Sequence, residues 1–216
     1  IKILNPKYYL PFAGTYTLGG KLSVLNSQRY VPTIDEAYNY LEKNVCNKTN
    51  IPIKINPETT FDSSLNETSS PFKNFDKKSW LHHIDNYLSN KKYFYENDEN
   101  IKISELHDLI GSAHKKWVEK KRLNNIDIKT DILLHFDNQL AELSKNNNLN
   151  FIKVNDYSKK KNYVKFRIDK KLLFNLLKGP RFAHWNNAEI GSHIFFDRNP
   201  NIFERNLYFS MSYFHI

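Results

Sequence analysis

Cysteine is nearly absent from this chain, since Cys46 is the only one among 216 residues. A disulfide framework and a cysteine-based zinc site are therefore both excluded within it. No stretch approaches the roughly 18 consecutive apolar residues that a membrane-spanning helix needs, and no signal-peptide pattern is present. These absences predict a cytoplasmic protein. The sequence opens at Ile1 without an initiator Met, which indicates a processed chain or a fragment.

Positive charge, by contrast, is in excess. Lys and Arg number 32 against 23 Asp and Glu, which gives a net charge of +9. Such a balance favours anionic partners, namely nucleic acid, phospholipid headgroups, or phosphorylated or carboxylated small molecules. The basic residues form short clusters that we interpret as solvated helix faces or loops: Lys115-Lys116, Lys120-Lys121-Arg122, Lys159 to Lys161 and Lys170-Lys171.

The first 58 residues predict an α/β arrangement. A strand is expected over 8–11, and alternating Ile residues predict another over 51–55. Between them a helix is expected over 34–45, because Thr33 suits the N-cap and acidic residues follow in the first turn. The Ser/Thr/Asn-rich stretch 56–75 is the best candidate for a boundary or a flap.

The rest of the chain divides into two predicted segments. Residues 59–126 predict a helical insertion, with one helix over 79–89 capped by Asp76 and another over 104–123 capped by Ser104. Residues 127–216 predict an α+β lobe. Its expected strands are 128–136, 151–154 and 163–168, and its expected helices are 137–144 and 170–178. An aromatic amphipathic segment follows over 202–214.

Small residues follow the first predicted strand, at the kind of position where open α/β folds bind ligands. Backbone approaches a ligand closely only where side chains are small. We therefore predict a pocket wall made of Phe12, Ala13, Gly14, Thr15 and Tyr16, in which the backbone amides of Gly14 and Thr15 bind an anion. The alternative is a tight turn whose small residues merely avoid a neighbouring helix.

A second group of polar side chains lies in an aromatic-rich stretch near the C-terminus. We predict that Asn187, Glu189 and Arg198 contact a substrate, with Arg198 holding a phosphate or carboxylate through two parallel hydrogen bonds. His193 is the predicted catalytic residue, since an imidazole can donate a hydrogen bond or shuttle a proton. The alternative is structural, with Arg198 pairing with Asp197 or Glu204.

The eight histidines do not show the spacing of a metal site. His107 and His114 share a helix face but are seven residues apart, whereas metal pairs on helices usually lie three or four apart. The neighbouring pair His82-His83 has no partner at that spacing either. No metal ligand is predicted, and these side chains are interpreted as surface or core histidines.

Two segments carry a resemblance to a known family. The first is Pro6-Lys-Tyr-Tyr-Leu-Pro-Phe-Ala-Gly-Thr-Tyr16, a predicted strand that ends in Pro-Phe-Ala-Gly. The second is Trp185-Asn-Asn-Ala-Glu-Ile-Gly-Ser-His-Ile-Phe-Phe-Asp-Arg-Asn-Pro-Asn-Ile-Phe203. They resemble a strand and the C-terminal signature of the metallo-β-lactamase fold, in the branch that contains CMP-N-acetylneuraminate hydroxylase. Glu189 and His193 depart from that signature. The stretch from about 60 to 150 carries no resemblance.

The motifs that hold metal in this family are missing from the chain. Neither His-x-His-x-Asp-His nor the Cys-x-His and Cys-x-x-His pair of a Rieske cluster occurs. The resemblance places both motifs upstream of the Pro-Phe-Ala-Gly strand. It therefore implies the C-terminal half of a metallo-β-lactamase-type αββα sandwich, with iron or zinc in an upstream half supplied by the same protein or by a partner chain.

The resemblance also implies a function. The chain would belong to a metal-dependent enzyme, a hydrolase or an oxidoreductase acting by oxygenation, whose substrate is an anionic small molecule such as a sugar nucleotide or glycan precursor. Alone it is not expected to be active. The alternative is a non-catalytic basic module that binds nucleic acid or an acidic protein, although no helix-turn-helix, zinc finger or aromatic RNA-binding strand signature is present.

Overall fold

The computed structural model describes residues 3–11, 16–28, 32–44, 50–158 and 162–216. The chain forms two compact units, unit 1 from Ile1 to Lys91 and unit 2 from Lys92 to Ile216. Both contain helices and strands, so the predicted α/β class is confirmed. The three-part division at 58 and 126 differs from this single division after Lys91 and stays a prediction. No helix among the described residues has the length and apolar character that a membrane crossing requires.

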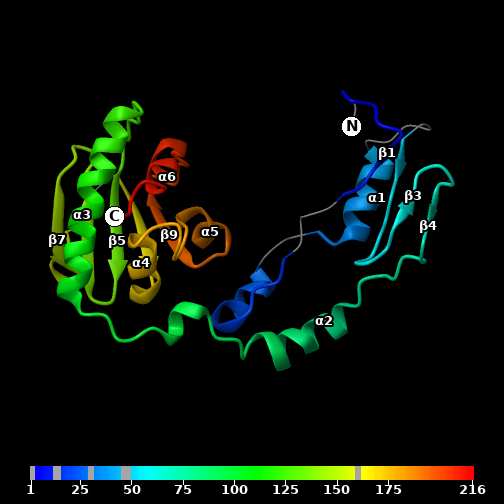
Figure 1. Ribbon diagram of the computed structural model, residues 1–216, viewed down its shortest axis with the longest axis horizontal. Coiled ribbons are helices and arrows are strands. Elements are labelled where there is room, and N and C mark those ends of the chain that lie inside the picture. The colour runs from blue at the N-terminus through cyan, green and yellow to red at the C-terminus, as the bar shows by residue number, and fades with distance from the viewer. Residues whose placement is uncertain (1–2, 12–15, 29–31, 45–49, 159–161) are drawn as a thin grey trace. The chain divides into compact units, whose positions relative to one another are not determined.

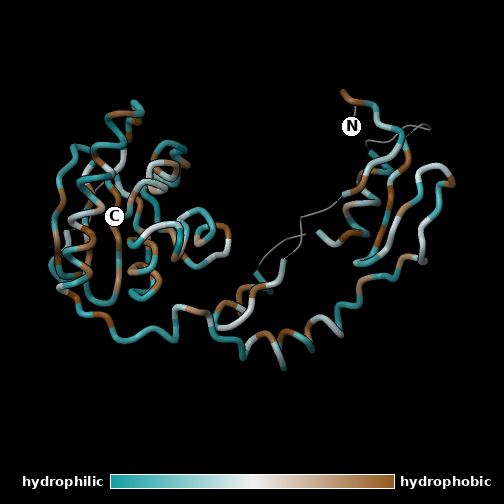
Figure 2. Tube along the Cα trace, viewed as in Figure 1, coloured by the Kyte–Doolittle hydropathy of each residue, from teal (hydrophilic) through white to brown (hydrophobic). Residues whose placement is uncertain are grey.

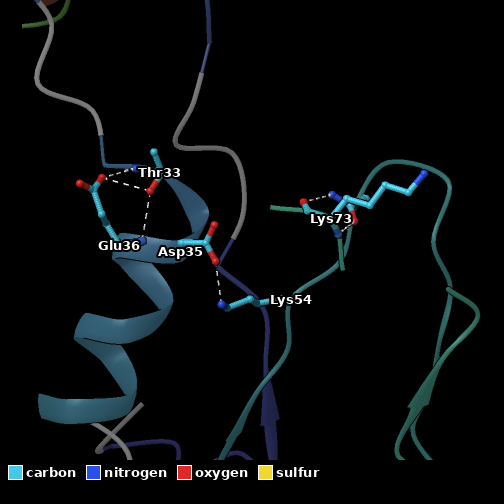
Figure 3. Close-up of polar contacts among 6 residues, drawn as sticks. Thr33, Asp35, Glu36, Lys54 and Lys73 are labelled. Carbon is cyan, nitrogen blue, oxygen red and sulfur yellow. Dashed lines mark hydrogen bonds and ion pairs between the residues drawn. The ribbon is translucent and has the colours of Figure 1, made fainter. Parts of the chain in front are cut away.

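Unit 1 contains a short strand–helix–strand arrangement. β1 (Tyr8–Tyr9) pairs in parallel with β2 (Ile51–Pro52), and α1 (Ile34–Asn44) lies between them in the sequence. Thr33 and Glu36 form a reciprocal cap at the start of α1, in which the Glu36 amide donates to Thr33 Oγ1 at 3.1 Å and the Thr33 amide to Glu36 Oε2 at 2.7 Å. Asp35 pairs with Lys54 at 2.7 Å (Figure 3). The sequence prediction of this helix and its cap is confirmed.

The remainder of unit 1 is made of short elements. β3 (Phe61–Asp62) and β4 (Glu67–Thr68) form a hairpin inside the stretch predicted to be a loop. η1 (Gly20–Gln28), α2 (Lys77–His83) and η2 (Ile84–Leu88) complete the unit. As predicted, Asp76 caps α2 by accepting from the Lys78 amide at 2.9 Å.

Unit 2 is built on a five-stranded mixed sheet with the order β7-β6-β5-β8-β9. β5 (Asp131–Phe136), β6 (Gln139–Leu143) and β7 (Leu149–Lys153) form an antiparallel meander. β8 (Tyr163–Ile168) pairs in parallel with β5, and β9 (Ile194–Asn199) pairs antiparallel with β8. β5 therefore lies at the centre of the sheet, beside a strand that is far from it in sequence.

Helices cover one face of this sheet and form the main core with it. They are α3 (Ile103–Leu123), α4 (Lys170–Leu177), α5 (Trp185–Ile190) and α6 (Arg205–Met211), shown with the strands in Figure 1. Leu106 and Ile110 of α3 are buried with Ile132 and Leu134 of β5. Figure 2 shows hydrophilic and hydrophobic residues mixed along these elements, as expected where each buries one side. Each such fully buried side chain stabilises the fold by about 1.5–3 kcal/mol.

The other face carries a smaller cluster. Leu133, Leu140 and Tyr163 are buried there, with the partly buried Ile152 and Tyr157 against them. Val154 and Tyr157 belong to the connection from β7 to β8, which includes η4 (Val154–Asp156). This connection leads from β7, at the edge of the sheet, to β8, which pairs with the central strand β5.

A short segment before α3 is fixed to α4 by polar contacts. Tyr95, in η3 (Phe94–Asn97), is buried. The Lys171 ammonium donates to the carbonyl oxygens of Glu96 and Asp98, and the Asn175 amide donates to the Asp98 carboxylate at 2.6 Å. Unit 2 therefore starts structurally at about residue 92 rather than at α3.

Two of the predicted boundaries in unit 2 are confirmed and one is displaced. Asp169 caps α4 by accepting from the Lys171 amide at 3.0 Å, and Gly179, with φ of +103°, follows the end of the helix as a C-terminal glycine does. α3 begins one residue earlier than predicted, after Lys102, and Ser104 lies inside the helix rather than at its cap.

The predicted helix over 137–144 is wrong, because this stretch is the second strand of the meander. Asp137 takes a left-handed conformation, with φ of +48°, and turns the chain so that β6 returns along β5. The side chains from Leu140 to Leu143 point alternately to the two faces of the sheet, and all of them are buried. Sheet pairing and burial outweigh the helix propensity of Ala, Glu and Leu here.

His114 on α3 makes the stability of unit 2 depend on pH. Burial lowers the pKa of His114 below 6.5, and the nearby Lys121 charge lowers it further. In the interval between this lowered pKa and 6.5, the unfolded chain binds more protons than the native chain. We expect the free energy of unfolding to fall as pH decreases through this interval. Urea titrations should show a shallower fall for His114→Gln, and an unchanged slope would contradict the assignment.

Candidate functional site

A cavity of about 460 Å³ lies in unit 2 between the sheet, α5 and α6. It is within the size range of small-molecule sites. Phe166 of β8 and Ile194 and Phe196 of β9 line it from the sheet. The two helices and their flanking residues supply the remaining wall: His184, Trp185, Asn186, Glu189, Ile190, Phe203, Arg205, Tyr208, Phe209, Met211 and Ser212.

The cavity wall is mainly aromatic. Tyr208 stacks on Phe203 at 4.7 Å and on Phe166 at 5.9 Å between ring centroids, and the ring of Phe196 meets it edge-on at 5.4 Å. Phe203, Phe209 and Ile190 are more than half exposed although they line the cavity, so they form its mouth. The surface is suited to a flat or apolar molecule.

The rear of the cavity is held by the C-terminal residues. Trp185 is buried, and its indole Nε1 donates to the Phe214 carbonyl oxygen at 2.9 Å. The rings of these two residues also meet edge-on, with centroids 6.0 Å apart. This anchors the start of α5 and fixes one wall of the cavity.

Two groups on the wall are polar and poorly solvated. The hydroxyl oxygen of Tyr208 is buried and has no hydrogen-bond partner among the described residues. Burial raises the pKa of the Glu189 carboxyl, whereas the Arg198 charge lowers it. A buried donor without an acceptor costs about 1–3 kcal/mol, and unit 2 bears this cost itself because the enclosed hydroxyl oxygen is out of reach of a molecule in the cavity.

Arg198 stands beside the cavity. It occupies the same face of β9 as Ile194 and Phe196, because alternate residues of a strand share a face, and its guanidinium lies 5.8 Å from the Tyr208 ring centre. Among the described residues, Arg198 forms no ion pair with Asp197 or Glu204, the partners that a purely structural role would give it. Asp197 instead contacts Lys165 at 3.4 Å, and Glu204 accepts from the Lys129 amide at 2.6 Å.

Of the polar group predicted near the C-terminus, only Glu189 lines the cavity. Asn187 is exposed on α5, where its carbonyl oxygen accepts from the Gly191 amide at 2.8 Å. His193 lies outside the lining residues: its Nδ1 is 3.2 Å from the Tyr95 hydroxyl, and its ring meets that of Tyr93 edge-on at 4.6 Å. The structure thus places His193 beside η3, and its catalytic role stays a prediction.

The pocket wall predicted in unit 1 is mostly outside the described residues. This applies to Phe12, Ala13, Gly14 and Thr15. Tyr16 is described, and it is exposed in unit 1. Its role in substrate binding stays a prediction.

No family model, curated protein or solved structure matches this chain. The cavity is therefore the feature on which a functional assignment depends.

The described residues offer no ligand set for iron or zinc, since no three His, Cys, Asp or Glu side chains among them converge on one point. His107 stacks on Phe151 at 4.0 Å, and His114 lies against Trp117 at 5.7 Å between ring centroids. His107 is partly buried and His114 is buried, and each packs against a different aromatic ring of unit 2.

One basic cluster differs from the predicted solvated face. Lys121 is buried, with its ammonium 3.9 Å from the Trp117 ring centre and 2.9 Å from Asn147 Oδ1, to which it donates. Lys116, on the same helix, donates to the backbone oxygen of Ile216 at 3.3 Å. These two cations of α3 have partners within the unit, which weakens the case for a continuous basic surface along this helix.

The sequence reasoning missed most of the cavity. The segment 202–214 contains Phe203, Tyr208 and Phe209. The sequence predicts that it is aromatic and amphipathic but does not indicate that it binds a ligand. One feature of the sequence could have indicated the cavity: the segment 202–214 contains more aromatic residues than one face of a helix can bury. Only the pairing of β9 with β8 shows that this segment faces Phe166 and Phe196.

Proposed function

We propose that unit 2 binds a small molecule whose body is apolar or aromatic and whose polar end is anionic. The observation that carries this is the cavity of about 460 Å³, whose wall combines the rings of Phe166, Phe196, Phe203, Tyr208 and Phe209 with a few polar side chains. Arg205 on the wall and Arg198 beside it supply positive charge for the polar end.

This proposal agrees with the substrate class implied by the resemblance. In that setting the chain would be the C-terminal part of a metallo-β-lactamase-type, metal-dependent enzyme, and unit 2 would hold the substrate while hydrolysis or oxygenation takes place elsewhere.

Removing an aromatic side chain from the mouth tests the site. We expect Phe209→Ala to weaken binding of anilinonaphthalene sulfonate to the 216-residue chain about tenfold, because it loses about 1–2 kcal/mol of apolar contact. Phe209 is 53% exposed, so the fold should tolerate the change. Fluorescence titration measures the dissociation constant.

Phe195→Ala is the matched control. Phe195 is 42% exposed and belongs to the same unit, but on β9 it alternates with the cavity residues Ile194 and Phe196 and therefore faces away. This variant should bind the probe as the unmodified chain does. Equal weakening by both substitutions, or none by either, would contradict a site in this cavity.

A further inference from the structure

The wall of the cavity holds a carboxyl group where the proposed ligand carries negative charge. Glu189 lines the cavity from α5, and Tyr208 lines it from α6. Arg198 acts on the ionisation of both, and Glu189 acts on that of Tyr208. Glu189 forms no direct ion pair with Arg198 among the described residues. An ionised Glu189 on this wall would therefore repel an anionic ligand in the cavity.

An ionised Glu189 and the anionic end of a ligand would repel each other in this cavity. Like charges a few ångströms apart repel strongly where the dielectric constant is low, and two acidic groups that share a site respond by holding one proton between them. The repulsion disappears if Glu189 is protonated. Its carboxyl then becomes a hydrogen-bond donor, as the Tyr208 hydroxyl already is.

We propose that an anionic ligand enters this cavity together with one proton, which Glu189 takes up from solvent. The inference rests on the proposed function. In the bound state the Glu189 carboxyl donates to the oxygen-bearing end of the ligand, and Arg198 compensates its charge. The balance is simple: carboxylate, proton and free anion become the neutral acid and the bound anion, with no bond formed or broken in the ligand.

The groups around Glu189 come from several elements. Arg198 acts on it from β9. Tyr208, on α6, lines the same cavity and is affected by Glu189 and by Glu204, the residue before that helix. Arg205 also lines the cavity, as does His184, whose Nδ1 accepts from the Asn186 amide at 3.2 Å and caps α5. Burial raises the pKa of Glu189 above its ordinary value, so the proton is taken up more readily than by an exposed acid.

A matched pair of probes separates charge from shape. Anilinonaphthalene sulfonate is anionic at all relevant pH values, and phenylnaphthylamine has nearly the same aromatic body without the sulfonate. Calorimetric titration of the 216-residue chain in buffers of different ionisation enthalpy gives the number of protons taken up with each probe. We expect uptake approaching one proton with the sulfonate and none with the neutral amine. Affinity for the sulfonate should rise as pH falls, by at most about tenfold per pH unit.

The variant Glu189→Gln identifies the group. It should bind the sulfonate without proton uptake and with little dependence on pH. Proton uptake that persists in Glu189→Gln would assign it to another group and overturn the inference. If the variant does not fold, the difference in proton uptake between the two probes in the unmodified chain still decides the coupling.

The outcomes distinguish this inference from the proposed function. Binding of both probes in the cavity without proton uptake would overturn the coupling and leave the binding site in place. Binding of the amine but not of the sulfonate at any pH would overturn the anionic end. If neither probe binds, both the site and the coupling are wrong.

Discussion

A chain that contains only residues 92–216 is expected to fold by itself and to unfold in one cooperative transition. Both hydrophobic clusters consist entirely of residues within this range. The sheet is also complete, because all five strands belong to it. Urea denaturation followed by circular dichroism and by the fluorescence of Trp117 and Trp185 should give coincident curves.

A shorter chain over 102–216 is the control for the boundary. It lacks Tyr95, which is 2% exposed, and the Glu96 and Asp98 oxygens that accept from Lys171 and Asn175. Its midpoint should lie below that of the longer fragment, since the burial of a large apolar side chain such as Tyr95 is worth about 1.5–3 kcal/mol and the contacts to Lys171 and Asn175 are lost with it. Equal midpoints, or a 92–216 fragment that does not fold, would show that unit 2 is wrongly delimited.

The substitution Trp117→Ala is expected to cost about 3–5 kcal/mol in the free energy of unfolding of unit 2, as large-to-small changes of core aromatic residues do. Trp117 is fully buried. Its indole Nε1 donates to Ser210 Oγ at 3.1 Å and its ring meets Phe214 edge-on, so it joins α3 to α6 and to the C-terminal residues. Lys121 would also lose the aromatic face on which its ammonium rests.

Leu123→Ala is the matched control on the same helix, because Leu123 is 58% exposed. Its effect should stay within about 0.5 kcal/mol. Trp117→Phe should lie between the two, since it keeps a ring in place and leaves Ser210 without its donor. Urea denaturation monitored by far-ultraviolet circular dichroism compares all three. A loss for Trp117→Ala no greater than for Leu123→Ala would contradict the central position of Trp117 in the core.

Local signals in the sequence predicted much of the secondary structure. Thr33, Asp76 and Asp169 identify three helix starts correctly, because a short side chain that accepts a backbone hydrogen bond acts within a few residues. The same is true of Gly179 after α4. The α/β class followed from these signals and from the alternation over β8.

Other features depend on contacts that sequence patterns do not contain. Residues 137–144 contain good helix formers, yet 139–143 form β6 because β5 and β7 both pair with them. The division after Lys91 depends on which helices bury their faces against the sheet. The cavity forms because β9 brings Ile194 and Phe196 opposite Tyr208. Sequence patterns do not contain this contact, so they predict Glu189 as a ligand-binding residue but not the aromatic residues around it.

The parallel pairing of β5 with β8 has a consequence for the order in which the molecule assembles. The meander of β5, β6 and β7 joins neighbouring segments and closes only short loops, whereas β8 reaches β5 only after the whole meander and its connection have been traversed. Long-range pairings form late because their loop-closure entropy must be overcome first. We therefore expect the walls that β8 and β9 contribute to the cavity to form late in folding. A nascent or partly unfolded chain would then lack a complete cavity and would not bind the ligand. Ligand binding could therefore be used to detect chains of unit 2 that are fully synthesised and folded.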